Sequence, residues 1–201
     1  HPPYGTTAYT DWIVRLYKES RLCRDEGKYA PAMFLVKLNE VLMVNEDLRP
    51  KEAMMQLKEG EKLKTDHAFN GTSGSRCYRM VNEQIPELKR LSQTDHAGLT
   101  PKLTCLTQKL AKIYGDDRNA LGLVICRCPA VAKYLSKIIS ESNITLNKGI
   151  HPIHLEEIGE CEDDGEESPK LAQQRVILED FKSDGRYNLV ISTDFEQVDL
   201  E

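Results

Sequence analysis

The sequence predicts an α/β fold with a separate all-α part: a helical bundle followed by an incomplete, parallel β-α-β sheet. Before about residue 120, apolar residues recur at helical spacing, whereas after it short apolar runs alternate with helical stretches. The charge changes at the same place. Residues 1–120 carry 19 Lys and Arg against 16 Asp and Glu, while residues 121–201 carry 8 against 16. We therefore expect two domains, 1–115 and 116–201, with the boundary at the turn-forming residues 114–117.

The first helix is predicted from a cap and an apolar stripe. Thr6 or Thr7 can cap it, and its apolar side chains follow the spacing i, i+3, i+4, i+7, i+8, at Tyr9, Trp12, Ile13, Leu16 and Tyr17. Gly27 is expected to end this region, and Pro31 suits the first turn of a second helix. That helix is apolar on more than one side, at Phe34, Leu35, Leu38, Val41, Leu42 and Val44, which predicts the centre of a bundle.

Three more helices complete the first part. Asn45 or Asp47 with Pro50 starts a third helix that ends at Gly60. Ser75 can cap a fourth helix that reaches Leu91 and is kinked or broken at Pro86, because proline lacks a backbone donor. Thr100 and Pro101 open the fifth helix, whose inward positions are expected at Leu103, Leu106, Leu110 and Ile113.

The second part follows a β-α-β-α-β order. We predict strands at 121–126, 150–155 and 187–192, and helices at 129–142 and 169–181. Such an order implies a parallel sheet with right-handed crossovers.

Composition points to a soluble, cytoplasmic chain. Of its residues 40% are hydrophobic and 29% are charged, and no apolar run approaches the roughly 18 residues that a membrane-spanning helix needs. Six irregularly spaced cysteines are too few for a secreted disulfide framework, so we expect them to be reduced.

Several segments, in order, resemble one helicase family. Residues 5–14, Gly-Thr-Thr-Ala-Tyr-Thr-Asp-Trp-Ile-Val, resemble the opening of the helical insertion in the second RecA-like domain of RIG-I-like receptors and Dicer-related helicases. The Leu-Val-Lys-Leu-Asn-Glu-Val-Leu run at 35–42, with Arg49 and Ala53, resembles the insertion's long helix, and Pro101-Lys102-Leu103 resembles the segment that returns to the RecA fold. The segments 122–125, 174–181 and 188–193 are similar to helicase motifs IV, IVa and V.

This resemblance implies a fragment of a cytoplasmic, double-stranded-RNA-binding, RNA-dependent ATPase of antiviral RNA sensing or RNA interference. The parent protein would use ATP and Mg²⁺ and would close around RNA together with its first RecA-like domain. The resemblance also implies protein partners in RNA sensing or silencing. The glutamine of motif IVa, Gln174, and the threonine of motif V, Thr193, are the residues that the resemblance assigns to RNA or motor contacts.

The first helix also supplies a basic ridge. Arg15, Lys18 and Arg21 follow one another at i, i+3, i+6, and duplex RNA is recognised through phosphates and 2′-hydroxyl groups rather than base edges. These three residues are our candidates for RNA contact within the insertion. The alternative is a solvated helix face, balanced by Asp11 and Glu19.

The sequence departs from the family pattern in three places. After the first strand the family places threonines and a basic residue, whereas this chain has Cys126-Arg127-Cys128-Pro129; we expect Arg127 to contact a phosphate. After Thr193 the family's glycine is missing. The run 156–167 holds eight carboxylates and would repel a phosphate backbone, so we predict a solvated loop there.

The sequence predicts neither a metal site nor a catalytic site. The set Cys126, Cys128, His151 and His154 could be imagined as a zinc site, but its spacing is unlike zinc modules, and buried thiols with ordinary strand histidines explain it. The sequence has no Gly-Lys-Ser/Thr phosphate loop and no Asp-Glu-x-His box, so this chain alone should bind no cofactor and hydrolyse no ATP. The alternative function is a degenerate, non-catalytic helicase-derived module that acts as a protein-interaction scaffold.

Overall fold

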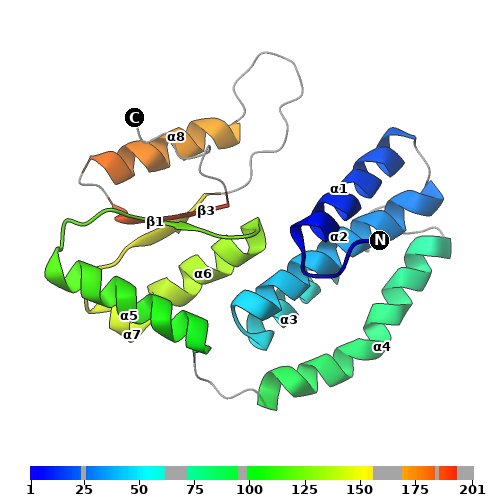
Figure 1. The fold of residues 1–201 in the computed structure, drawn as a ribbon, viewed down its shortest axis with the longest axis horizontal. Coiled ribbons are helices and arrows are strands. Elements are labelled where there is room, and N and C mark those ends of the chain that lie inside the picture. Colours follow the sequence, from blue (N-terminus) through cyan, green and yellow to red (C-terminus); the bar gives the residue numbers. More distant parts are fainter. Residues whose placement is uncertain (24–25, 62–71, 95–98, 156–168, 184–185, 194–201) are drawn as a thin grey trace. The chain divides into compact units, whose positions relative to one another are not determined.

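The structure is a computed structural model that describes residues 1–23, 26–61, 72–94, 99–155, 169–183 and 186–193. The chain forms two compact units, His1–Gly98 and Leu99–Glu201. Figure 1 shows helices alone in the first unit, and a small sheet with helices in the second. The predicted fold class, an all-α part with a partial α/β part, is confirmed.

Four helices build the described part of the first unit: α1 (Thr7–Leu22), α2 (Glu26–Asp47), α3 (Pro50–Glu61) and α4 (Thr72–Thr94). Thr6 caps α1 as predicted: its backbone is extended, and its hydroxyl oxygen accepts a 3.2 Å hydrogen bond from the Tyr9 backbone N–H. Tyr9 and Ile13 are buried on the inner face of α1. Because α2 contacts α1, α3 and α4, the predicted central helix of the bundle is confirmed.

Two predicted helix starts were wrong. Helix α2 begins at Glu26 and runs through Pro31, and Gly27 lies inside it. A proline there removes a single backbone hydrogen bond, the one to the carbonyl of Gly27, so the helix tolerates it close to its start. Helix α4 begins at Thr72 rather than after Ser75, and it continues through Pro86 to Thr94. Figure 1 shows the axis of α4 changing direction along its length, as a proline-containing helix is expected to do.

The second unit begins with α5 (Pro101–Asp116) and contains one parallel sheet. Its strands are β1 (Gly122–Ile125), β2 (Pro152–His154) and β3 (Leu189–Ser192), and its further helices are α6 (Pro129–Glu141), α7 (Asn143–Leu146) and α8 (Pro169–Lys182). The strand order is β1-β3-β2, and both outer strands pair with β3 in parallel. All predicted strands and helices of this part are present, with ends shifted by a few residues.

Helices cover both faces of the sheet. On one face, α8 contributes Phe181 to a buried cluster with Leu155 and Val190, against which Ile177 and Leu178 also pack. On the other face, α6 contacts β2 and β3, as Figure 1 also shows. The middle strand is fully buried, since each residue from Leu189 to Ser192 is inaccessible to solvent.

Helix α5 belongs with the sheet. The sequence grouped it with the first part, up to residue 115, whereas the compact units divide at Gly98 and Leu99. The reason lies in Tyr114, whose hydroxyl donates a 2.6 Å hydrogen bond to the backbone carbonyl of Asn188, beside β3. Ile113 was expected to face inward, but 52% of it is exposed, because Tyr114 takes the inner position at this turn of the helix.

Candidate nucleic-acid interface

The predicted basic ridge lies on the exposed side of α1. Arg15, Lys18 and Arg21 are all exposed. Within the part of the chain that the structure describes, Arg15 and Arg21 form no ion pair, although Asp11 and Glu19 lie on the same helix. Two guanidinium groups that are not neutralised are therefore available to an anionic partner.

The orientation of α1 is set by contacts with α2. Asn39, which is buried, donates its Nδ2 to the hydroxyl of Thr10 at 3.2 Å. Tyr17 packs beside the buried Ala30 and Met33, and its ring centroid lies 5.5 Å from that of Tyr29. These contacts cover the buried face of α1, which lies away from Arg15 and Lys18 and beside Arg21, so the basic side chains project from a helix that packs on its neighbour.

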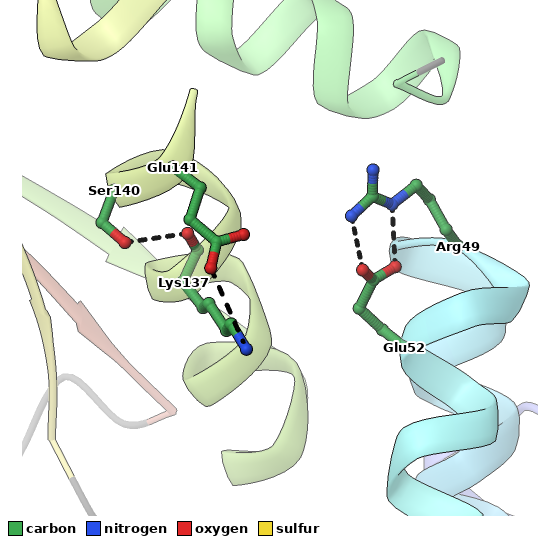
Figure 2. Close-up of polar contacts among 5 residues, drawn as sticks. All are labelled: Arg49, Glu52, Lys137, Ser140 and Glu141. Atoms are coloured by element: carbon green, nitrogen blue, oxygen red, sulfur yellow. Dashed lines mark hydrogen bonds and ion pairs between the residues drawn. The ribbon is translucent and has the colours of Figure 1, made fainter. Parts of the chain in front are cut away.

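The polar residues of the long-helix motif hold the bundle together. The Lys37 ammonium lies 3.0 Å from Glu40, and Gln56 of α3 donates to the same carboxylate at 3.0 Å. The guanidinium of Arg49 engages both oxygens of Glu52, with its Nε 2.8 Å from one of them, as Figure 2 shows. Glu52 is only 4% exposed, so this pair is structural. The i, i+3 spacing of Arg49 and Glu52 was the available sequence signal for it.

In the second unit, the parallel register brings two predicted residues to one edge of the sheet. Ile125, the last residue of β1, is paired with Ser192, the last residue of β3, and the Cys126 N–H donates to the Ser192 carbonyl at 2.7 Å. Thr193 directly follows β3, and Arg127 lies two residues after the end of β1. Both therefore lie at the carboxyl edge, which is where parallel sheets usually bind ligands. Arg127 is exposed and Thr193 is partly buried.

The amino-terminal end of α6 lies at the same edge. Cys128 is its N-cap residue and makes no side-chain capping bond, and Pro129 occupies the first turn. The first backbone N–H groups of a helix carry a partial positive charge and attract anions. Together, Arg127, Thr193 and this helix end offer a guanidinium, a hydroxyl and backbone donors to a phosphate group.

Gln174 does not join this edge as an exposed group. It lies on α8 and is only 5% exposed. It lies three, four and seven residues before Ile177, Leu178 and Phe181. These positions share one face of α8, and that face packs on the sheet. An amide buried on this face would position α8 rather than meet solvent, and the same helical spacing was visible in the sequence.

The described residues contain no group of three or more His, Cys, Asp or Glu side chains able to hold a metal ion. Cys126 follows β1, whereas His151 precedes β2 and His154 ends it. Since β3 lies between those strands, their backbones are about 10 Å apart. Among the helices described, none is both long and apolar enough to cross a membrane. The acidic run 156–167 and the segment after Thr193 lie outside the described residues.

Comparison with known proteins gives one informative match. No protein-family model matches the chain. The chain is 26% identical over 200 residues to the human protein named antiviral innate immune response receptor RIG-I, and this alignment covers 94% of the chain. The chain spans 21% of the length of that protein. This similarity indicates a relationship to RIG-I-like helicases.

An alignment that covers 94% of the chain includes most of both compact units. The relationship to RIG-I-like helicases therefore rests on the helical unit and the sheet unit together, as the order of the motifs predicted. The link to Dicer-related helicases and the site residues stay predictions.

Proposed function

We propose that this chain is the duplex-RNA-contacting part of a cytoplasmic RIG-I-like RNA helicase that takes part in antiviral RNA sensing. The helical insertion would comprise the first compact unit, up to residue 98, and α5 with the sheet would form part of the second RecA-like domain. The order of a helical unit and a partial parallel sheet supports this assignment, as does the similarity to RIG-I.

One observation carries the proposal of RNA contact: Arg127, Thr193 and the start of α6 meet at the carboxyl edge of the sheet. Each of these groups binds phosphate oxygens well, and none of them reads a base. The basic ridge of Arg15, Lys18 and Arg21 supplies a second contact of the same kind on the helical unit. Such contacts suit A-form RNA, whose backbone shape is recognised more readily than its sequence.

The chain alone does not fit ATP and Mg²⁺. A motor of this class needs a glycine-rich loop that ends in Gly-Lys-Ser or Gly-Lys-Thr, and acidic residues that hold the metal, and neither motif occurs in the sequence. We therefore assign nucleotide and metal binding to the parent protein. The contribution of this chain would be RNA contact and closure against the first RecA-like domain.

The test is the salt dependence of duplex RNA binding, measured by fluorescence anisotropy on the 201-residue chain. Phosphate contacts release counterions, so the logarithm of affinity should fall linearly with the logarithm of salt concentration, by about 0.9 per contact. Arg127→Gln should reduce that slope by about 1. The triple change of Arg15, Lys18 and Arg21 to Glu should lower affinity further. RNA binding that is absent, or that does not respond to salt, would contradict the proposal.

A second candidate function is a protein-interaction scaffold without RNA contact. An apolar groove of about 450 Å³ between α2, α3 and α4 favours it. The groove is lined by Leu38, Val41, Leu42, Asn45, Pro50, Ala53, Met54, Leu57 and Leu88. If the chain fails to bind duplex RNA but captures a helicase-pathway protein, and Leu42→Glu abolishes that capture, the scaffold function replaces the one proposed here.

A further inference from the structure

Helix α5 carries a second row of positive charge, and two of its three lysines lie outside the segments that resemble the helicase family. Lys102, Lys109 and Lys112 are exposed on it, at the spacing i, i+7, i+10. From Leu99 to Gly115 the sequence contains no Asp or Glu, in a chain whose overall net charge is -5. We name the three residues the lysine stripe.

Packing of α5 fixes the direction of the lysine stripe. The buried positions of the helix are Leu103, Thr107, Leu110 and Tyr114. With 100° of rotation per residue, the three lysines lie about 110° to 170° from the centre of this buried face and within about 80° of one another. Burial of these four side chains and the hydrogen bond from Tyr114 to Asn188 orient α5, so the stripe faces outward along about 15 Å of helix.

Two of the three lysines of the stripe carry a charge that no described residue neutralises. Lys109 and Lys112 form no ion pair with any described residue. They lie three residues apart on one helix, where like charges destabilise the helix slightly. Lys148 adds a fourth positive charge beside the last turn, because its Nζ would lie only 3.2 Å from a Cβ placed on Gly115. A surface that accumulates positive charge at a cost to the helix is suited to an anionic partner.

The composition of the surface favours a phosphate backbone over a protein. Protein interfaces are depleted in lysine and are anchored by Trp, Tyr and Arg, and none of these occurs among the exposed residues of α5. Ile113 is the large apolar side chain exposed in this region of the helix. Lysine acts as a flexible point charge that meets phosphates without strict geometry. A row of lysines along a straight helix therefore matches a row of phosphates along one RNA strand.

We propose that the lysine stripe of α5 is a separate contact for the phosphate backbone of duplex RNA, distinct from the carboxyl edge of the sheet and from the ridge on α1. This inference rests on the proposed function, because it assigns another part of the surface to the same partner. The lysine stripe consists of other residues than these two sites. Its orientation depends on the anchoring of α5 by Tyr114.

The experiment compares two variants of the 201-residue chain with equal charge changes. In the stripe variant, Lys102, Lys109 and Lys112 are all replaced by Gln. In the control variant, the exposed Lys133, Lys137 and Arg186 of the same unit are replaced by Gln. Lys137 pairs with Glu141 across 3.9 Å of exposed surface (Figure 2), so little stability is lost with it. Thermal unfolding verifies that both variants fold.

The stripe variant should show a salt slope smaller by about 2 and an affinity for blunt duplex RNA about 100-fold lower at 0.1 M salt. When the losses of affinity are expressed as logarithms, the control variant should lose less than about a third as much as the stripe variant. Equal losses of affinity in the two variants would show that the change in net charge alone weakens RNA binding, and would overturn the proposal.

Two further outcomes are decisive. If the stripe variant keeps the full slope while Arg127→Gln loses part of it, the lysine stripe is excluded and the proposed function stands. If the unaltered chain binds no RNA, both proposals fall. A poly-glutamate peptide serves as a competitor: if it displaces the duplex at equal charge concentration, and only when the stripe is intact, the surface is an acidic-protein site and the proposal is overturned.

Discussion

The hydroxyl of Tyr114 donates a 2.6 Å hydrogen bond to the backbone carbonyl of Asn188, across 74 positions of sequence. Asn188 in turn uses its own side chain at the start of β2: its Oδ1 accepts from the His151 N–H at 2.7 Å, and its Nδ2 donates to the Gly149 carbonyl at 2.8 Å. This pair therefore joins α5, the amino end of β3 and the segment before β2. The orientation of the lysine stripe and the position of α5 in the second unit both depend on it.

Tyr114→Phe should destabilise the second unit by about 1 to 2 kcal/mol, because the Asn188 carbonyl loses a buried donor while the ring stays in place. The thermal unfolding midpoint should fall by several degrees. Tyr4→Phe is the control: this residue is 66% exposed and its hydroxyl bonds to Tyr9 at the surface, so the midpoint should fall by less than in Tyr114→Phe. A Tyr114→Phe protein as stable as the parent would show that the bond contributes nothing.

The same tyrosine should make stability sensitive to alkaline pH. Burial raises the pKa of Tyr114 from its usual value near 10 to about 12. Because the folded pKa lies above the unfolded one, this contribution is complete below pH 10 and is lost as pH rises from about 10 to 12. Wild type should lose up to about 2 kcal/mol more of its unfolding free energy over this range than Tyr114→Phe does. Parallel curves for the two proteins would contradict the prediction.

The close approach of the Tyr114 hydroxyl to the backbone requires a glycine at position 122. A Cβ at this position would lie 2.6 Å from the Tyr114 hydroxyl oxygen and 2.9 Å from Leu189 Cδ1. Gly122→Ala should therefore cost about 1 to 3 kcal/mol. In the Tyr114→Phe background the cost should be smaller, since the nearest atom is gone, and urea unfolding of all four proteins gives the coupling. Strict additivity would mean that the clash with Leu189 dominates.

These contacts also explain what the sequence could predict. Strands β1 and β3 are short apolar runs bounded by turn residues, and helix α5 opens with the Thr100 and Pro101 signal, so local pattern was sufficient to find them. Periodicity showed that α5 has an inward face, but not which core it faces, because that choice depends on Asn188. For the same reason the local pattern predicts a boundary turn at Tyr114 and an inward position for Ile113.

For the candidate site, the sequence placed Arg127 and Thr193 correctly after strands, and the parallel pairing with β3 then brought them to one edge. The family resemblance predicts a contact role for Gln174, whereas its helical register with Phe181 predicts the burial that the structure shows. Likewise Arg49 was noted as a family position, whereas its role depends on the buried Glu52 one turn later.

Arg49→Ala should destabilise the helical unit by about 3 kcal/mol, since it leaves the carboxylate of Glu52 buried without its partner. Replacing both residues, Arg49→Met with Glu52→Gln, should cost less than the single change, because no buried charge then remains. Chemical denaturation followed by circular dichroism measures both. The prediction is contradicted if the double variant is the less stable of the two.

The ridge on α1 should not act evenly, because a spacing of three residues falls about 60° short of a full turn. Measured from the buried Ile13, Arg15 and Lys18 project at about 160° and 140°, whereas Arg21 projects at about 80°, beside the packed face. If duplex RNA lies against the outer side of α1, Arg15→Glu and Lys18→Glu should each lower affinity about 10-fold, and Arg21→Glu by less than about 3-fold. Anisotropy titrations at one fixed salt concentration compare the three. Equal losses would mean that the duplex approaches α1 from the side of Arg21, and a loss confined to Arg21 would exclude the outer side altogether.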